Sequence, residues 1–340
     1  MSPVVVNTSH ALRVYSFGSG IPFQIPWSYI PKNVMLNLAF VFRILGNPDF
    51  KELMSYRHSH GLPGDFPMGG PSVRRSVHTF CFGLPELELP ITIPPNVGLY
   101  GPVALDFTPL SREDELSVWL DRGRTIAMSM GTHFNYSETQ VRSTLRGFIA
   151  GAPPTDQVFW KLHGKAKFQH VLDEELENER VKERFRIVDW MDADPGEIMK
   201  HENVVAYVHH GGANSYYEAA RWVPGLVHSP TVSLVVRVAY GTSHRAGIPQ
   251  IILAQWFDLY DMAVRAEYVG IGIYGNRDVA PDIDATEFGA AISRLLSPGE
   301  EAERFSRKAK EIGEACRMAP GKRGAVAKIL ELVEGEDQEA

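Results

Sequence analysis

The chain has 340 residues, of which 44% are hydrophobic and 22% charged, and its formal net charge is −7. This length predicts two domains with substantial cores, and the acidic balance excludes nucleic acid as the main partner because no basic stripe is available to neutralise phosphates. Cys81 and Cys316 are too few for a disulfide framework and suit a reducing compartment. No secretory leader and no apolar run long enough to span a bilayer is visible, so a cytoplasmic location is expected.

The first third of the chain is rich in Pro and Gly and predicts few regular elements. Residues 34–45 form an apolar run with two polar interruptions, which indicates an amphipathic helix over a core or, alternatively, a helix at a membrane surface. Residues 61–70 and 85–109 are interpreted as long loops, and loops of this length are often functional. The composition changes near residue 121, where a domain boundary is expected.

From residue 124 onward, predicted strands and helices alternate. Strands are expected at residues 124–132, 158–162, 186–189, 204–208, 251–253 and 270–274. Helices are expected at residues 173–183, 195–201, 286–296, 300–318 and 324–333. This alternation is typical of βαβ units and predicts a doubly wound parallel sheet.

Residues 204–218 carry the most informative pattern in the chain: an apolar strand, a two-glycine turn and the start of a helix. A helix that begins there directs backbone N–H groups and its dipole at an anionic ligand, and the glycines let the backbone approach a phosphate closely. Polar side chains at suitable positions can add donors or accept from a sugar hydroxyl; they are His210, Asn214, Ser215 and Glu218. The segment predicts a site for a phosphorylated ligand, with a strand–turn–helix corner that binds nothing as the alternative.

With neighbouring blocks, this segment resembles the donor half of the UDP-glycosyltransferases, the two-domain enzymes of the GT-B fold. The blocks that carry the resemblance occur in the family's order: Trp190, then His210, Gly212, Asn214, Ser215 and Glu218, then Gly247-Ile248-Pro249 and finally Asp258. The wording around these blocks is most similar to fungal glycosyltransferases of natural-product pathways. The resemblance implies two Rossmann-like domains, the first incomplete: residues 1–121 as a remnant of the acceptor-binding domain with its linker, and residues 122–340 as the donor-binding domain.

The family's roles carry over to individual residues as what the resemblance implies. Trp190 would stack on the uracil, and Glu218 would accept from the ribose hydroxyls. His210, Asn214 and Ser215 would hold the diphosphate at the helix that starts after Gly212. Thr132 would face the same phosphates from the first loop of the domain, and Asp258 would bind the transferred sugar. Trp190 as a core aromatic and Asp258 as a helix N-cap are the alternatives.

The sequence departs from the family at the sugar site and within the donor domain. Leu259 stands where the family usually has a sugar-binding Gln, and Ala213 replaces a Trp that is common in plant members. Residues 221–244 form an atypical insertion with a β-prone apolar run, and joining Ala220 to Arg245 restores the expected continuous element. The insertion is interpreted as translated non-coding sequence, such as a retained intron, with a genuine family-specific loop as the alternative.

The family's catalytic base is the largest departure. In these enzymes a histidine in a Gly-His-x-x-Pro setting deprotonates the acceptor hydroxyl, and none of the 12 histidines here has that setting. His10 comes closest in order, and Asn7 lies near the position expected for the orienting Asp. The chain is therefore expected to be truncated at its start, and no catalytic residue is assigned.

The sequence thus predicts a UDP-sugar-dependent glycosyltransferase that moves a hexosyl group onto a hydroxyl of a lipophilic small molecule. UDP-sugar is a co-substrate, and neither a cofactor nor a metal is expected; His58 and His60 are interpreted as a chance pair. The alternatives are a non-catalytic remnant that binds nucleotide-sugars and, more weakly supported, a GT-B epimerase. The chain as it stands is expected to bind UDP weakly and to transfer sugar poorly or not at all.

Overall fold

The computed structural model describes residues 15–16, 18–62, 77–90, 92–103, 110–221 and 247–339. The expectations for Asn7 and His10, for most of the loop at 61–70 and for nearly all of the insertion at 221–244 fall outside these residues. Within the described part of the chain, no helix is both long and apolar enough to cross a membrane.

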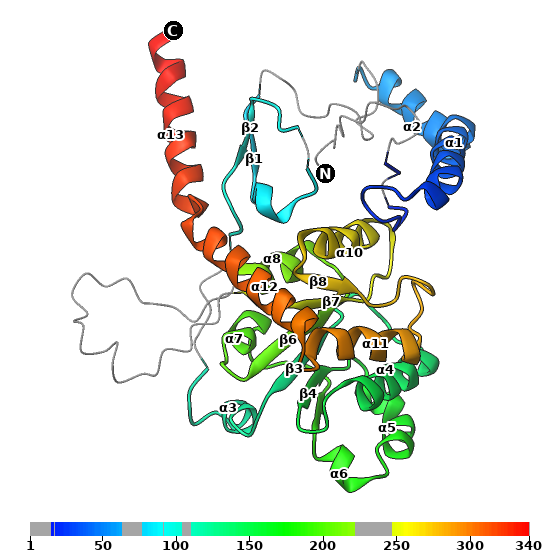
Figure 1. The fold of residues 1–340 in the computed structure, drawn as a ribbon. Helices are drawn as coiled ribbons and strands as arrows, with labels where there is room; N and C mark the ends of the chain where they lie inside the picture. The colour runs from blue at the N-terminus through cyan, green and yellow to red at the C-terminus, as the bar shows by residue number, and fades with distance from the viewer. Residues whose placement is uncertain are drawn as a thin grey trace, which may run out of the picture.

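A six-stranded parallel sheet forms the centre of the larger part of the molecule (Figure 1). Its spatial order is β5-β4-β3-β6-β7-β8, and its strands are β3 (Thr125–Ser129), β4 (Gln157–Lys161), β5 (Phe185–Val188), β6 (Val204–His209), β7 (Gln250–Ile252) and β8 (Gly272–Tyr274). Counted along the chain, this order is 3-2-1-4-5-6, which is the order of doubly wound nucleotide-binding folds. The predicted doubly wound parallel sheet is therefore confirmed, with all six strands within a few residues of their expected positions.

Helices cover both faces of this sheet, which is why its central strands consist almost entirely of buried residues. One face packs against α4 (Glu138–Gly151), α5 (Gln169–Glu175) and α11 (Ala285–Leu296). The other face packs against α3 (Glu115–Leu120), α7 (Pro195–Met199), α8 (Ala213–Arg221) and α10 (Phe257–Val269). The short α6 (Glu179–Lys182) precedes β5. Helix α12 (Glu300–Met318) contributes side chains to the packing on both faces of the sheet. Helix α3 precedes residue 121, but its apolar side chains belong to the core of the sheet.

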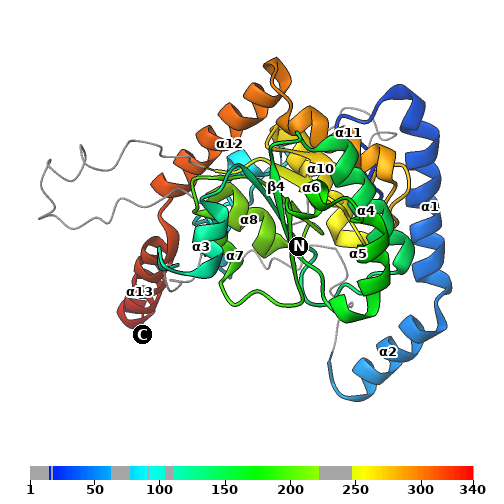
Figure 2. The same cartoon turned by 90° about the horizontal axis from the view of Figure 1, so that it is seen from below.

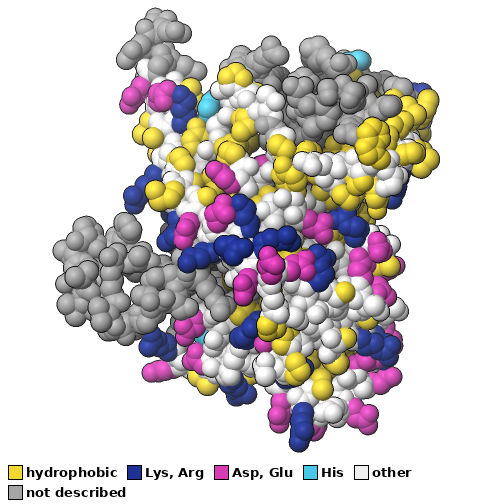
Figure 3. Space-filling view, viewed as in Figure 1, with side chains coloured by type: hydrophobic (Ala, Val, Ile, Leu, Met, Phe, Trp, Pro, Cys, Tyr) yellow, Lys and Arg dark blue, Asp and Glu magenta, His cyan; other side chains and the backbone are white. Residues whose placement is uncertain are grey.

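The first part of the chain contains two helices, α1 (Ile30–Gly46) and α2 (Pro48–Ser59), and a small parallel sheet of β1 (Thr79–Cys81) and β2 (Val97–Leu99). Because β2 lies within residues 85–109, the expectation that this whole stretch is a loop is wrong. Helix α1 confirms the predicted helix, and Leu36 packs against the core as expected. However, Met35 is 62% exposed and Phe42 70% exposed, and hydrophobic side chains gather over this end of the molecule (Figure 3).

The last helix returns to the first part of the chain. Helices α12 and α13 (Gly321–Glu339) meet beside β2, where the N–H of Gly321 donates to the carbonyl of Tyr100 at 2.6 Å. From there α13 runs away from the main sheet on the side opposite α1 and α2, as the two views agree (Figure 1; Figure 2). The residue that follows β2 is therefore in direct contact with the first residue of the C-terminal helix.

Candidate functional site

The carboxyl ends of three neighbouring strands define the candidate site. β3 and β6 lie side by side in the middle of the sheet, at the point where the chain switches from one half of the sheet to the other. Ser129 at the end of β3 pairs in register with His209 of β6 on one side and with Lys161 of β4 on the other. In doubly wound sheets, ligands bind in the crevice outside these strand ends. The glycine turn after β6 opens here, as the sequence predicts.

The two adjacent histidines after β6 have different environments. His209 is fully buried; its Nδ1 accepts the N–H of Gly211 at 3.1 Å, and its Nε2 lies 2.8 Å from Oε1 of Gln250. Since Nδ1 must accept, Nε2 carries the proton, and the ring is neutral. Burial lowers the pKa of His209 to about 3. His209 therefore holds the turn in place, and His210 is the histidine that is available to a ligand.

The imidazole of His210 lies between two glycines from different loops. A Cβ added at Gly131, in the loop after β3, would lie 2.9 Å from Cε1 of His210, and one added at Gly212 would lie 2.6 Å from Nε2. Gly131 and Gly211 also have φ values of +78° and +97°, which L-residues with side chains rarely adopt. Each glycine is therefore required by space or by backbone geometry, which the two-glycine pattern alone does not reveal.

His210 is half-buried among titratable groups from three elements. Burial lowers its pKa most, Asp258 acts in the opposite direction, and Lys161 and His133 lower it further. Its Nδ1 is buried and has no hydrogen-bond partner among the residues that the structure describes. The ring is thus a neutral group with hydrogen-bonding capacity to spare, surrounded by the ends of β3, β4 and β6 and the start of α10.

The first two turns of α8 contribute the polar residues that the sequence predicts. Asn214 is exposed and Ser215 is half-buried, close enough to Tyr207 to hydrogen-bond its hydroxyl. Glu218 is half-buried one turn further; burial raises its pKa, and Asp194 raises it further. Because Asp194 follows Trp190 in the same loop, that loop and α8 face each other. Thr132, beside Gly131, is exposed at the same end of the sheet.

Trp190 follows β5 and is 55% exposed, so its interpretation as a core aromatic is wrong. The ammonium of Lys161 lies over its ring, 4.3 Å from the centroid, and His163 approaches the ring edge-on at 6.5 Å between centroids. An indole that is held in this way but remains half-exposed can offer area to a flat ligand.

Helix α10 brings Asp258 to the site from the far side of β6. The N-cap position of α10 is Trp256, and Asp258 is exposed in the first turn, so its interpretation as the N-cap is wrong. The indole of Trp256 lies 5.9 Å from the ring of His210. Leu259 is only 2% exposed and packs in the core with Ala263 and Tyr216. The side chain that replaces the family's Gln therefore points into the protein.

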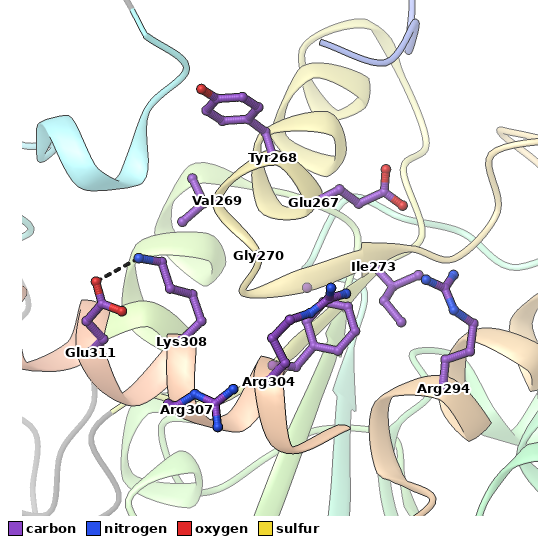
Figure 4. Close-up of a pocket in the computed structure, with 12 residues that line it drawn as sticks. Glu267, Tyr268, Val269, Gly270, Ile273, Arg294, Arg304, Arg307, Lys308 and Glu311 are labelled. Atoms are coloured by element: carbon purple, nitrogen blue, oxygen red, sulfur yellow. Dashed lines mark hydrogen bonds and ion pairs between the residues drawn. The ribbon is translucent and has the colours of Figure 1, made fainter. Parts of the chain in front are cut away.

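The structure thus gathers the predicted residues at one end of the sheet, together with three residues that the sequence analysis missed: Lys161, His133 and Trp256. A cavity of about 630 Å³ lies elsewhere, at the amino end of β8 between α10 and α12 (Figure 4). Of the four cations that line it, Arg294 and Arg304 pair with Glu301, and Lys308 pairs with Glu311. We therefore place the functional site at the carboxyl ends of the strands, on topology and chemistry.

Comparison with known proteins shows the fold and a sequence relative. No family model matches the chain. The fold is that of the GT-B enzymes: the chain is similar to a UDP-glucose: anthocyanidin 3-O-glucosyltransferase in complex with UDP, with a TM-score of 0.55 and 15% identity over 77% of this chain and 53% of that one. It is also similar to Phytolacca americana UGT2 complexed with UDP-2fluoro-glucose and pterostilbene, with a TM-score of 0.51 and 18% identity over 71% and 49% of the two chains.

A sequence relative makes the likeness more specific. The glycosyltransferase sdnJ of Sordaria araneosa is 35% identical over 335 residues, which cover 90% of this chain and 60% of that protein. The expected resemblance to fungal glycosyltransferases and to the GT-B fold is therefore confirmed, and the chain spans about 60% of the length of this relative.

Proposed function

We propose that the chain is the donor-binding part of a UDP-sugar-dependent glycosyltransferase that transfers a hexosyl group to a hydroxyl of a lipophilic small molecule. The observation that carries this proposal is the convergence of Trp190, His210, Glu218 and Asp258 at the switch point of the sheet. The name of the Sordaria relative and the UDP bound in the structural relatives support it. We also propose that residues 122–340 form the domain that binds the UDP-sugar donor.

The nucleotide would lie across the strand ends with its base at Trp190. The half-exposed indole offers a stacking face, and Glu218, held in the second turn of α8, can accept from the ribose hydroxyls. The raised pKa of Glu218 reflects a carboxylate that has lost part of its hydration, so hydroxyl donors from a sugar would replace water.

The diphosphate would lie at the start of α8. Backbone N–H groups after Gly212, with the side chains of Asn214, Ser215 and Thr132, can donate to its oxygens. His210 is neutral in the free protein because burial lowers its pKa, so it would also bind as a hydrogen-bond donor. These fixed dipoles stabilise the negative charge that builds on UDP as the bond to the anomeric carbon breaks.

Asp258 would bind hydroxyls of the transferred sugar. It is exposed at the start of α10, close enough to His210 to affect its pKa, and so lies at the phosphate end of the proposed nucleotide path. The buried Leu259 cannot share this role. We assign no base for the acceptor hydroxyl.

Calorimetry with UDP and measurement of UDP release test the proposal in two steps. The purified chain is expected to bind UDP, and the Glu218→Gln variant is expected to bind it more weakly. The chain is then incubated with a panel of UDP-sugars and lipophilic alcohols. Release of UDP that depends on an acceptor supports transfer, while binding without release supports the non-catalytic alternative. Failure of the folded chain to bind any uridine nucleotide would overturn both.

A further inference from the structure

Lys161 is a buried cation at the centre of the site. It is the last residue of β4, in register with Ser129 of β3, and only 6% of the residue is exposed. Among the residues that the structure describes, its ammonium makes no ion pair with a carboxylate. Burial lowers the pKa of Lys161, and no acidic neighbour opposes this effect.

A buried charge without a counter-ion is costly, because the protein does not replace the hydration that the ammonium loses. The ring of Trp190 compensates for part of this loss, since its π face attracts the cation at 4.3 Å. This contact does not use the N–H donors of the ammonium, which can still form charge-assisted hydrogen bonds with an anion. The ammonium of Lys161 can therefore pair with a negatively charged group of a ligand, because the part of the protein that the structure describes provides no such group itself.

The location of Lys161 indicates which part of a nucleotide ligand would supply the negatively charged group. On one side it contacts Trp190, the proposed base platform; on the other it acts electrostatically on His210, the proposed phosphate ligand. A nucleotide that spans these two residues has its diphosphate within reach of the ammonium.

We propose that Lys161 is the residue that selects nucleoside diphosphates over uncharged nucleosides at this site, by pairing its ammonium with the diphosphate. This inference rests on the proposed function. The competing role is structural: Lys161 would only support the ring of Trp190, and its loss would then affect nucleoside and nucleotide alike.

Calorimetry with UDP and with uridine, on wild type and variants, separates these roles. Lys161→Met keeps the length and the apolar stem of the side chain, so packing is preserved while the charge is lost. We expect it to weaken UDP binding at least about tenfold while uridine binding changes less than about threefold. Lys161→Arg keeps the charge and should retain most of the preference for UDP. Lys167→Met removes an exposed lysine six residues further along the chain, and so serves as the control for the change in net charge.

The outcomes are distinct. Equal weakening of UDP and uridine in Lys161→Met would overturn the inference and leave the proposed function intact, whereas no binding of either by wild type would overturn the proposed function itself. If Lys161→Met does not fold, the pH dependence of wild type provides the test. Because burial lowers the pKa of Lys161, the preference for UDP should decline with rising pH before an ordinary lysine titrates, and Lys161→Arg should abolish this decline. A preference that stays constant across that range would contradict the inference.

Discussion

The backbone N–H of Gly18 lies 3.0 Å from both carboxylate oxygens of Asp261, so the first described segment of the chain is fastened to α10 only three residues beyond Asp258. The hydroxyl of Tyr15 donates to the same carboxylate at 3.4 Å. Phe257 packs on Gly18, where an added Cβ would lie 2.2 Å from the ring. The start of the described chain thus packs beside the first turns of α10, next to Asp258.

This contact predicts an unusual pH dependence. Burial raises the pKa of Asp261 to about 6, above the unfolded value of roughly 3.9. The folded state therefore binds more protons than the unfolded state between these values, and this contribution to stability is lost as the pH rises through 6. Asp261→Asn cannot titrate, so its free energy of unfolding relative to wild type should increase by up to about 3 kcal/mol between pH 4 and pH 7. Urea unfolding at each pH measures this; a constant difference would contradict it.

His209 predicts the opposite slope. Its folded pKa of about 3 lies below the unfolded value of roughly 6.5, so its contribution to stability is lost as the pH falls below 6.5. His209→Ala should cost about 3 kcal/mol at pH 7, because it leaves buried polar groups of Gln250 and Gly211 without a partner. The difference from wild type should shrink on acidification. His170→Ala, which removes a histidine whose side chain is 62% exposed, should change the unfolding free energy by less than about 0.5 kcal/mol. If His170→Ala also lost about 3 kcal/mol of unfolding free energy, the loss in His209→Ala could not be assigned to the buried hydrogen bonds of His209.

Gly212→Ala should impair the site more than the fold. The added methyl group would lie 2.6 Å from Nε2 of His210, and the ring must move away from the start of α8. We expect UDP binding to weaken about tenfold, as for the loss of one charge-assisted hydrogen bond, with a small change in melting temperature. Gly46→Ala is the matched control, because nothing lies within 4 Å of its new Cβ. Calorimetry that shows unchanged UDP binding in Gly212→Ala would remove His210 from the phosphate site.

Deletion of residues 221–244 should preserve the fold of the parallel sheet and its helices. The two flanks of the insertion already meet: the N–H of Ile248 donates to the carbonyl of Ala219 at 2.9 Å, and a Cβ added at Gly247 would lie 3.2 Å from the carbonyl oxygen of Ala220. In the deletion variant, two residues (Arg245 and Ala246) would join Ala220 to Gly247, and these two described positions already lie close together. We expect the deletion variant to melt within a few degrees of wild type and to bind UDP equally well. A variant that fails to fold would show that the insertion belongs to the domain; transcripts with and without its codons test its origin.

The parallel sheet could be predicted because its strands are short apolar runs between turn residues, as in Val204–His209. Helix α4 is absent from the sequence predictions although its signal is present: Ser137 and Gln140 form a capping box, and Val141, Leu145 and Phe148 follow at helical spacing. The first part of the chain was less predictable, since α2 buries none of its residues and so has no apolar periodicity.

The predicted site residues come from one contiguous motif, residues 210–218, and from three separate positions, Thr132, Trp190 and Asp258. Their order along the chain is what the sequence prediction used. Lys161 was not predictable in this way. It ends an apolar strand, and only the pairing of β4 with β3 places it beside Ser129 and near His210. The burial of Leu259 could not be predicted either. The sequence places this residue in a helix but does not fix which face of that helix turns toward the core.

Most of the side chains that we assign to the donor come from the loops and helix starts that follow the strands, whereas the strands themselves pack in the core. Asp258, for example, is exposed, whereas its neighbour Leu259 is anchored in the core. If the proposed function holds, substitutions at Asp258 or Trp256 should alter which sugar is accepted without disturbing the scaffold, which makes the start of α10 a natural target for redesigning donor preference.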